Sequence, residues 1–272
     1  MSGFGHRLTE EIERHGALCV GIDPHASLLK AWGLGQDVAG LREFSRRCVE
    51  AFAGHVALVK PQVAFYERFG SLGFTVLEET IGQLRAAGTL VVADAKRGDI
   101  GSTMAGYAEA WLGEGSPLQS DAVTVSPYLG VGALNAVFAQ SKENGAGVFV
   151  LAATSNPEAV EVQSSTDEHG RTVAQRIIDE CAAHNPNGRI GDIGVVVGAT
   201  VAQAPDLKAL NGPVLMPGVG AQGGSAADVE RIAAGALAVP NVSRSVLSAG
   251  PDVAALRAAA VEVASGYRRK SI

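Results

Sequence analysis

The sequence predicts a single (β/α)8 barrel, in which eight parallel strands form a closed ring surrounded by helices. Short runs rich in Val, Ile and Leu recur along the chain, and a longer stretch of helical character follows each run. Eight such units fit in about 250 residues, which is the usual size of this barrel. No Pro/Ser-rich linker divides the 272 residues, so we expect one domain over residues 1–272, with a doubly wound open sheet as the alternative.

The strands are expected where short apolar runs are bounded by Gly, Pro or a polar residue. In chain order they are Leu18–Asp23, Val56–Lys60, Leu90–Ala95, Ala122–Pro127, Gly147–Thr154, Ile193–Gly198, Pro213–Pro217 and Ala236–Val246. Pro240 and Asn241 interrupt the last run, so a shorter strand from Val242 is the alternative. The helices are expected at Phe4–Arg14, Leu41–Ala53, Phe74–Ala87, Ser102–Leu112, Val131–Asn144, Arg171–His184, Val201–Leu210, Ser225–Ala234 and Asp252–Tyr267. The polar segment Asn156–Gly170 predicts a long loop after the fifth strand.

The composition is that of a compact globular protein, with 47% hydrophobic and 18% charged residues, which excludes a disordered chain. The formal net charge is -6 and no basic run exceeds the short segment 268–270, which argues against nucleic-acid and membrane partners. An anionic ligand would therefore need a few cations gathered locally. Lys60, Lys96 and Arg244 are the candidates for that role.

The three cysteines, Cys19, Cys48 and Cys181, stand far apart in apolar or helical surroundings, which predicts reduced thiols in the core. The N-terminal residues are polar and acidic where a signal peptide is basic and then apolar, so the expected location is the cytoplasm. The six histidines, His25 included, show no metal-ligand spacing. No metal site is expected.

Charged residues follow the first three strands directly, at the end of a parallel barrel where active sites are built. Asp23 and Lys60 end the first two strands, Asp94 and Lys96 end the third, and Asp99 lies in the loop beyond. Because side chains alternate along a strand, Asp94 and Lys96 should project to the same side. Each charge alone could be a loop-facing ion pair. Together the five predict an alternating network held in place for chemistry.

A glycine-rich segment, PGVGAQGG at 217–224, follows the seventh strand and precedes a helix. Glycines let backbone N–H groups approach an oxyanion, and the helix N-terminus favours negative charge, so the segment is typical of a phosphate loop. Arg244 ends the eighth strand and can bind the same phosphate. The alternatives are a flexible turn beside a surface arginine and a dinucleotide site, for which no acidic ribose ligand follows.

The segment Thr154-Ser155-Asn156-Pro157 ends the fifth strand. Taken alone it is typical of a turn or a helix N-cap. The Ser155 hydroxyl could also bind the edge of a heterocycle.

Asp94-Ala95-Lys96-Arg97-Gly98-Asp99 matches the D-x-K-x-x-D signature of the orotidine 5′-phosphate decarboxylase family, which this sequence resembles. The other landmarks follow in order over nearly the whole chain and are Asp23, Lys60, Ser155, the PGVGAQGG segment and Arg244. The length and the polar segment after Ser155 resemble the longer branch of the family. Ser243 departs from the pattern, because family members often carry Gly before the arginine.

The resemblance implies decarboxylation of orotidine 5′-monophosphate to UMP and carbon dioxide, the last step of de novo pyrimidine nucleotide synthesis, by a homodimer without metal or cofactor. By resemblance, Asp94 lies against the substrate carboxylate, Lys96 protonates C6 and Lys60 orients Asp94 and the ribose. The remaining residues implied in the site are Asp23 and Lys60 at the ribose, Asp99 and Thr103 at the partner subunit's ribose, Ser155 at the pyrimidine, Gln222 between pyrimidine and phosphate, Pro217 beside the substrate and Arg244 at the phosphate.

Two alternatives stay open. Magnesium-dependent hexulose-phosphate synthases and ketogulonate-phosphate decarboxylases resemble this family down to the D-x-K-x-x-D motif, but they place a glutamate ligand on the second strand where this chain has Lys60. A catalytically silent nucleotide-binding barrel that acts as a sensor is the alternative from another class.

Overall fold

The computed structural model describes residues 2–220 and 223–267, and it confirms the predicted closed (β/α)8 barrel. Each strand pairs in parallel with the next in sequence, and the eighth pairs with the first. The strands are β1 (Cys19–Ile22), β2 (Leu58–Pro61), β3 (Leu90–Arg97), β4 (Ala122–Val125), β5 (Gly147–Ala153), β6 (Ile193–Val197), β7 (Pro213–Pro217) and β8 (Leu237–Val242). Every one of the eight lies within or overlaps a predicted strand.

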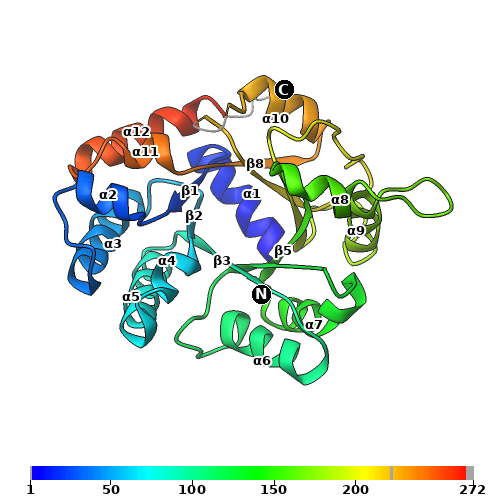
Figure 1. Ribbon diagram of the computed structural model, residues 1–272, viewed down its shortest axis with the longest axis horizontal. Coiled ribbons are helices and arrows are strands. Elements are labelled where there is room, and N and C mark those ends of the chain that lie inside the picture. Colours follow the sequence, from blue (N-terminus) through cyan, green and yellow to red (C-terminus); the bar gives the residue numbers. More distant parts are fainter. Residues whose placement is uncertain (1, 221–222, 268–272) are drawn as a thin grey trace.

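Helices lie around this ring and across one end of it (Figure 1). They are α1 (Phe4–His15), α2 (Ala26–Ala31), α3 (Val38–Phe52), α4 (Val63–Glu67), α5 (Gly70–Ala86), α6 (Gly101–Leu112), α7 (Asn135–Asn144), α8 (Val160–Gln163), α9 (Val173–Ala182), α10 (Ala226–Ala233), α11 (Arg244–Leu247) and α12 (Val253–Ser265), with 3-10 turns η1 (Val131–Leu134) and η2 (Pro157–Ala159). Among the described residues, no helix is both long enough and apolar enough to span a bilayer.

Helix α1 closes one end of the barrel and crosses the centre of the ring in Figure 1. Its residues Phe4, Leu8 and Ile12 are buried against the inward-facing side chains at the start of the strands. Phe4 packs edge-on against Phe149 with ring centroids 5.8 Å apart, and Gly147 leaves the space that the Phe4 ring fills. Because apolar side chains fill this end, a ligand can enter the interior at the carboxyl ends of the strands.

Some of the sequence predictions are wrong. The segment Val201–Leu210 forms turns and loop instead of a helix. Pro205 has no N–H to donate and fits poorly inside a helix, and the side chain of Gln175 bonds the backbone of Asp206 at both N–H and C=O. The apolar pattern that suggested a helix comes from Leu207 and Leu210, which are buried as loop residues.

The predicted last strand, Ala236–Val246, runs too far at its C-terminal end. Strand β8 ends at Val242, and Arg244 begins the short helix α11 instead of ending the strand. Pro240 and Asn241 are paired inside β8, opposite Met216 and Pro217 of β7, so the alternative start at Val242 is also wrong. The polar segment after β5 contains η2 and α8 in addition to loop.

Candidate active site

A cavity of about 790 Å³ opens at the carboxyl ends of the strands. Its floor has two chemically different halves. The polar half comes from strands β8, β2, β3 and β4 and from the end of β1, and consists of Asn241, Asp23, Lys60, Asp94, Lys96 and Thr124. The apolar half comes from β5, β6 and β7 and consists of Leu151, Val196 and Leu215. The cavity therefore suits a ligand with a flat apolar part and a charged edge.

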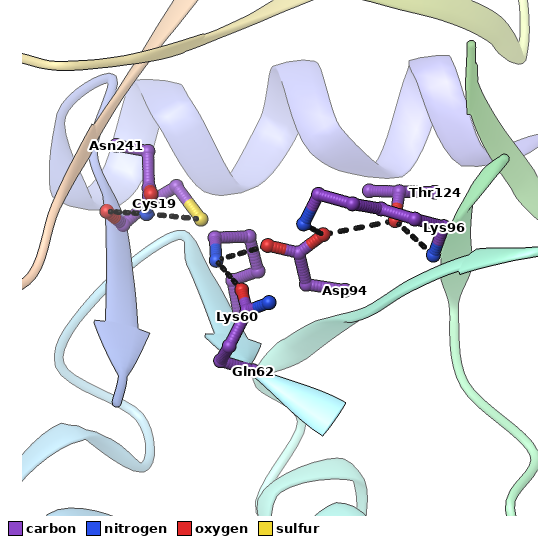
Figure 2. Close-up of polar contacts among 7 residues, drawn as sticks. All are labelled: Cys19, Lys60, Gln62, Asp94, Lys96, Thr124 and Asn241. Atoms are coloured by element: carbon purple, nitrogen blue, oxygen red, sulfur yellow. Dashed lines mark hydrogen bonds and ion pairs between the residues drawn. The ribbon is translucent and has the colours of Figure 1, made fainter. Parts of the chain in front are cut away.

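The carboxylate of Asp94 lies between two ammonium groups, as Figure 2 shows. Lys60 Nζ donates to its Oδ2 at 2.6 Å, and Lys96 Nζ donates to its Oδ1 at 2.5 Å. Only 5% of the Lys60 side chain and 9% of the Asp94 side chain are exposed, whereas 45% of the Lys96 side chain is exposed. Lys96 is thus the member of the group that can meet a ligand in the cavity.

Burial and charge act in opposite directions on this group. Burial alone would raise the pKa of the Asp94 carboxyl, but the ammonium groups of Lys60 and then Lys96 outweigh it and hold that pKa well below its ordinary value. Burial alone would lower the pKa of Lys60, but the carboxylates of Asp94 and then Asp23 raise it above the ordinary lysine value. Asp94 and Lys60 therefore stay ionised at neutral pH as a buried pair.

Three donors occupy the Asp94 carboxylate, because Thr124 Oγ1 also donates to Oδ1 at 2.9 Å. Lys60 Nζ in addition donates to Gln62 Oε1 at 3.2 Å. A divalent cation needs free carboxylate or carbonyl oxygens, and here the central acid is surrounded by hydrogen-bond donors. The Asp94 carboxylate is therefore an acceptor for two ammonium groups and one hydroxyl.

Asp23 lines the same cavity just beyond β1. Among the described residues, its Oδ1 is the one buried side-chain oxygen or nitrogen without a hydrogen-bond partner. A buried carboxylate oxygen is costly when it has no donor. The position suits a ligand hydroxyl that donates to it.

The rim of the cavity beyond β7 and β8 has the features of an anion site. Pro217, Gly218 and Val219 line it after β7, and Arg244 lines it from the first turn of α11. Gly218 has φ of 96°, a conformation that favours glycine, and its carbonyl accepts from the N–H of Gly224 at 3.0 Å. The predicted ligand Gln222 lies outside the described residues.

Three predicted site residues do not line this cavity. Asp99 and Thr103 lie on the β3–α6 loop and the first turn of α6, and the Asp99 carboxylate accepts from the N–H of Ile100 at 2.8 Å. Ser155 is exposed and lines a neighbouring cavity under α8, which shares Thr154 with the main one. Of the five charges expected in one network, Lys60, Asp94 and Lys96 are joined by hydrogen bonds. Asp23 lines the same cavity without such a bond, and Asp99 does not line it.

Sequence reasoning did not single out Gln62, Thr124 or Asn241, all of which line the cavity. Asn241 Nδ2 donates to the carbonyl of Cys19 at 3.1 Å, and burial raises the pKa of the Cys19 thiol to about 12. The only available signal was the two-residue alternation, which places Thr124 and Asn241 on the inner face of their strands. The three cysteines are free and buried, as predicted.

Comparison with known proteins agrees with this geometry. A family model described as "Orotidine 5′-phosphate decarboxylase / HUMPS family" matches residues 16–259. The orotidine 5′-phosphate decarboxylase of Corynebacterium efficiens is 64% identical over 270 residues, which is 97% of this chain and 96% of that protein.

Two solved structures support the same assignment. One from Streptomyces avermitilis, described as an orotidine 5′-phosphate decarboxylase, superimposes with a TM-score of 0.95 at 56% identity and covers 98% of this chain and 95% of that one. Leishmania donovani OMP decarboxylase gives 0.75 at 31% identity, with coverage of 98% and 99%. The chain therefore belongs to the orotidine 5′-phosphate decarboxylase / HUMPS family.

Proposed function

We propose that this chain decarboxylates orotidine 5′-monophosphate to UMP and carbon dioxide, the last step of de novo pyrimidine nucleotide synthesis, without metal or cofactor. The observation that carries the proposal is the buried Asp94 carboxylate held between Lys60 and Lys96, with the Lys96 side chain partly open to the cavity. Relatives of 56% to 64% identity over nearly the whole chain bear the name of this activity. We also propose that the barrel is one catalytic domain and acts in the cytoplasm.

The chemistry needs a proton at C6 and positive charge beside it. When the bond between C6 and the carboxylate breaks, carbon dioxide leaves and the electron pair stays on C6. The Lys96 ammonium stabilises that charge and transfers a proton to C6. Because the side chain is 45% exposed, solvent can return the proton to the amine after turnover. Asp94 holds the ammonium in place and lies against the substrate carboxylate.

The remaining groups bind the parts of the nucleotide that do not react. The unpartnered oxygen of Asp23 accepts from a ribose hydroxyl, and Lys60 orients Asp94 and the ribose. Arg244 and the segment after Pro217 bind the phosphate, whose binding energy supports catalysis at a distance. Ser155 and Gln222 remain the proposed contacts to the pyrimidine.

We propose a homodimer in which Asp99 and Thr103 serve the partner's site. Neither residue lines its own chain's cavity, and the exposed apolar side chain of Ile100 follows Asp99 directly. The adjoining loop exposes Tyr128 and Leu129, and it is joined to the β3 end by the bond from the Ser126 N–H to the Arg97 carbonyl. Such an apolar patch around polar residues is typical of a subunit contact.

The test is release of carbon dioxide from orotidine 5′-monophosphate by the purified chain in the presence of EDTA. Turnover that EDTA does not reduce is expected. A requirement for magnesium with hexulose or ketogulonate phosphates as substrates would contradict the proposal and favour the other enzymes of the family. Tight binding of UMP without any turnover would show a silent nucleotide-binding barrel instead.

A further inference from the structure

Strand β3 carries a bulge at the residues that hold the central charges. Ala93 pairs with Val123 of β4 and Arg97 pairs with Val125, so three residues of β3 stand opposite the single residue Thr124. The bulge spans residues 94–96, which include both Asp94 and Lys96. Bulges of this kind redirect side chains and are frequent beside active sites.

The backbone within the bulge is unusual. Lys96 has φ of 49°, in the left-handed region that a non-glycine residue adopts at a cost. Its N–H does not join the regular ladder between β3 and β4 and donates to the side-chain oxygen of Thr124 at 3.0 Å. Thr124 therefore supplies, from its side chain, the acceptor that the ladder would have supplied from its backbone.

The Thr124 hydroxyl connects this backbone to the charges. It has one proton, and because its oxygen accepts from Lys96, the proton is free to go to Asp94 Oδ1 at 2.9 Å. Only 1% of Thr124 is exposed, so water does not compete for either bond. Figure 2 shows the resulting ring of hydrogen bonds. The Lys96 ammonium contacts Asp94 directly, and the Lys96 backbone N–H is linked to Asp94 through the Thr124 hydroxyl.

We propose that Thr124 is a positioning residue for the decarboxylation proposed above: its hydroxyl holds the β3 bulge and thereby aims Asp94 and Lys96 at the reacting carbon. The residue does not itself touch the reacting atoms. It fixes one oxygen of Asp94 and the backbone of Lys96 at the same time, so the distance between proton donor and counter-ion does not depend on flexible side chains alone. Preorganisation of this kind lowers the barrier and leaves nucleotide binding unchanged.

Two substitutions separate the hydroxyl from the bulk of the side chain. Thr124→Val keeps the volume and removes both hydrogen bonds, whereas Thr124→Ser keeps the hydroxyl and removes only a methyl group. The matched control is Thr80→Val, because Thr80 is equally buried but its hydroxyl donates to the carbonyl of Val76 within α5, away from the cavity. Each protein is assayed for kcat and KM with orotidine 5′-monophosphate, for Kd with UMP, and for its free energy of unfolding.

The expected kcat of Thr124→Val is lower by about 10- to 100-fold, which corresponds to the loss of a charge-assisted bond. Its Kd for UMP should change by no more than about twofold, since the hydroxyl stabilises the transition state rather than the bound product. Thr124→Ser should recover most of the turnover although it loses packing, and Thr80→Val should keep wild-type kcat. A crystal structure of Thr124→Val should show Lys96 outside the left-handed region.

The proposal requires both the kinetic and the structural result. Wild-type kcat in Thr124→Val, an equal loss in Thr124→Ser, an equal loss in Thr80→Val, or an unchanged Lys96 backbone in Thr124→Val would each overturn it. If the wild-type chain does not decarboxylate orotidine 5′-monophosphate at all, the proposed function fails. In that case the Lys96 conformation in the Thr124→Val structure still decides whether Thr124 holds the bulge.

Discussion

Asp94 is stable as a buried anion because three donors surround it. An isolated carboxylate at this depth would take up a proton or force the site open, since desolvation of one charge costs several kcal/mol. The Lys60 and Lys96 ammonium groups reverse that preference and lower the Asp94 pKa. The same pairing keeps Lys60 charged although only 4% of this residue is exposed.

Replacing Asp94 by Asn should therefore destabilise the protein, because the buried Lys60 ammonium loses its main partner. We expect the free energy of unfolding at pH 7 to fall by about 3 kcal/mol, because one partner of a buried pair is removed. Without Asp94, we expect burial to outweigh the remaining charge of Asp23 and to lower the Lys60 pKa below its unfolded value. The unfolded state would then bind more protons, and stability would rise with pH. In the wild type the Lys60 pKa is raised, and its stabilisation is lost only as pH rises through that value.

Urea unfolding at pH 7 and pH 10 measures this effect. The difference in stability between wild type and Asp94→Asn should shrink at pH 10, because the buried Lys60 of the variant then no longer carries an unpaired charge. A difference that stays constant or grows would show that the loss of stability does not come from burying the unpaired Lys60 ammonium group.

Arg244 should matter for affinity more than for chemistry. Its position on the cavity rim beside Gly218 predicts a contact to phosphate, so Arg244→Ala should weaken substrate binding by about 2–4 kcal/mol. The measurement is KM for orotidine 5′-monophosphate together with Kd for inorganic phosphate as an inhibitor. Unchanged values of both would remove Arg244 from the proposed phosphate site.

At the scale of elements, the seam where β8 meets β1 depends on a pair of small residues. A Cβ on Gly21 would stand 1.9 Å from Ser243 Oγ and 3.0 Å from Ser243 Cβ. The serine that departs from the family pattern is thus accommodated by a glycine on the adjacent strand. Gly21→Ala should reduce the free energy of unfolding by about 1–3 kcal/mol through overpacking.

The double variant Gly21→Ala with Ser243→Gly should regain most of that stability, because the clashing side chain is gone. Urea unfolding of the two single variants and the double variant measures the coupling between the sites. Additive losses in the double variant would show that the two residues do not share this space.

The elements were predictable to different degrees. All eight strands were predicted because buried parallel strands are short, apolar and rich in β-branched residues, a local signal. The helix expected over Val201–Leu210 failed because buried leucines in a loop imitate helical spacing. The bulge at 94–96 was not predictable, since it depends on a hydrogen bond to Thr124, which is 28 residues further along the chain than Lys96. The roles of Asp99, Thr103 and Ser155 stay predictions.

At the scale of the whole molecule, the proposed dimer makes each active site composite. The site on one chain would take Lys96 from that chain and Asp99 from its partner. Lys96→Ala and Asp99→Ala proteins are unfolded together in equal amounts and refolded. About half of the dimers should be mixed, each with one intact site, so about a quarter of all sites should recover activity. No recovery, with mixed dimers shown to have formed, would contradict the shared site.

Lys96 is proposed to drive decarboxylation without a metal. The measurement is carbon dioxide release from carboxyl-labelled orotidine 5′-monophosphate in EDTA by three proteins: wild type, Lys96→Ala, and Lys208→Ala as a control at an exposed lysine outside the cavity lining. We expect full turnover by wild type and Lys208→Ala, and a loss of at least about 10³-fold in Lys96→Ala with UMP binding retained. Near-normal turnover by Lys96→Ala, or a wild type that EDTA inactivates, would contradict the account.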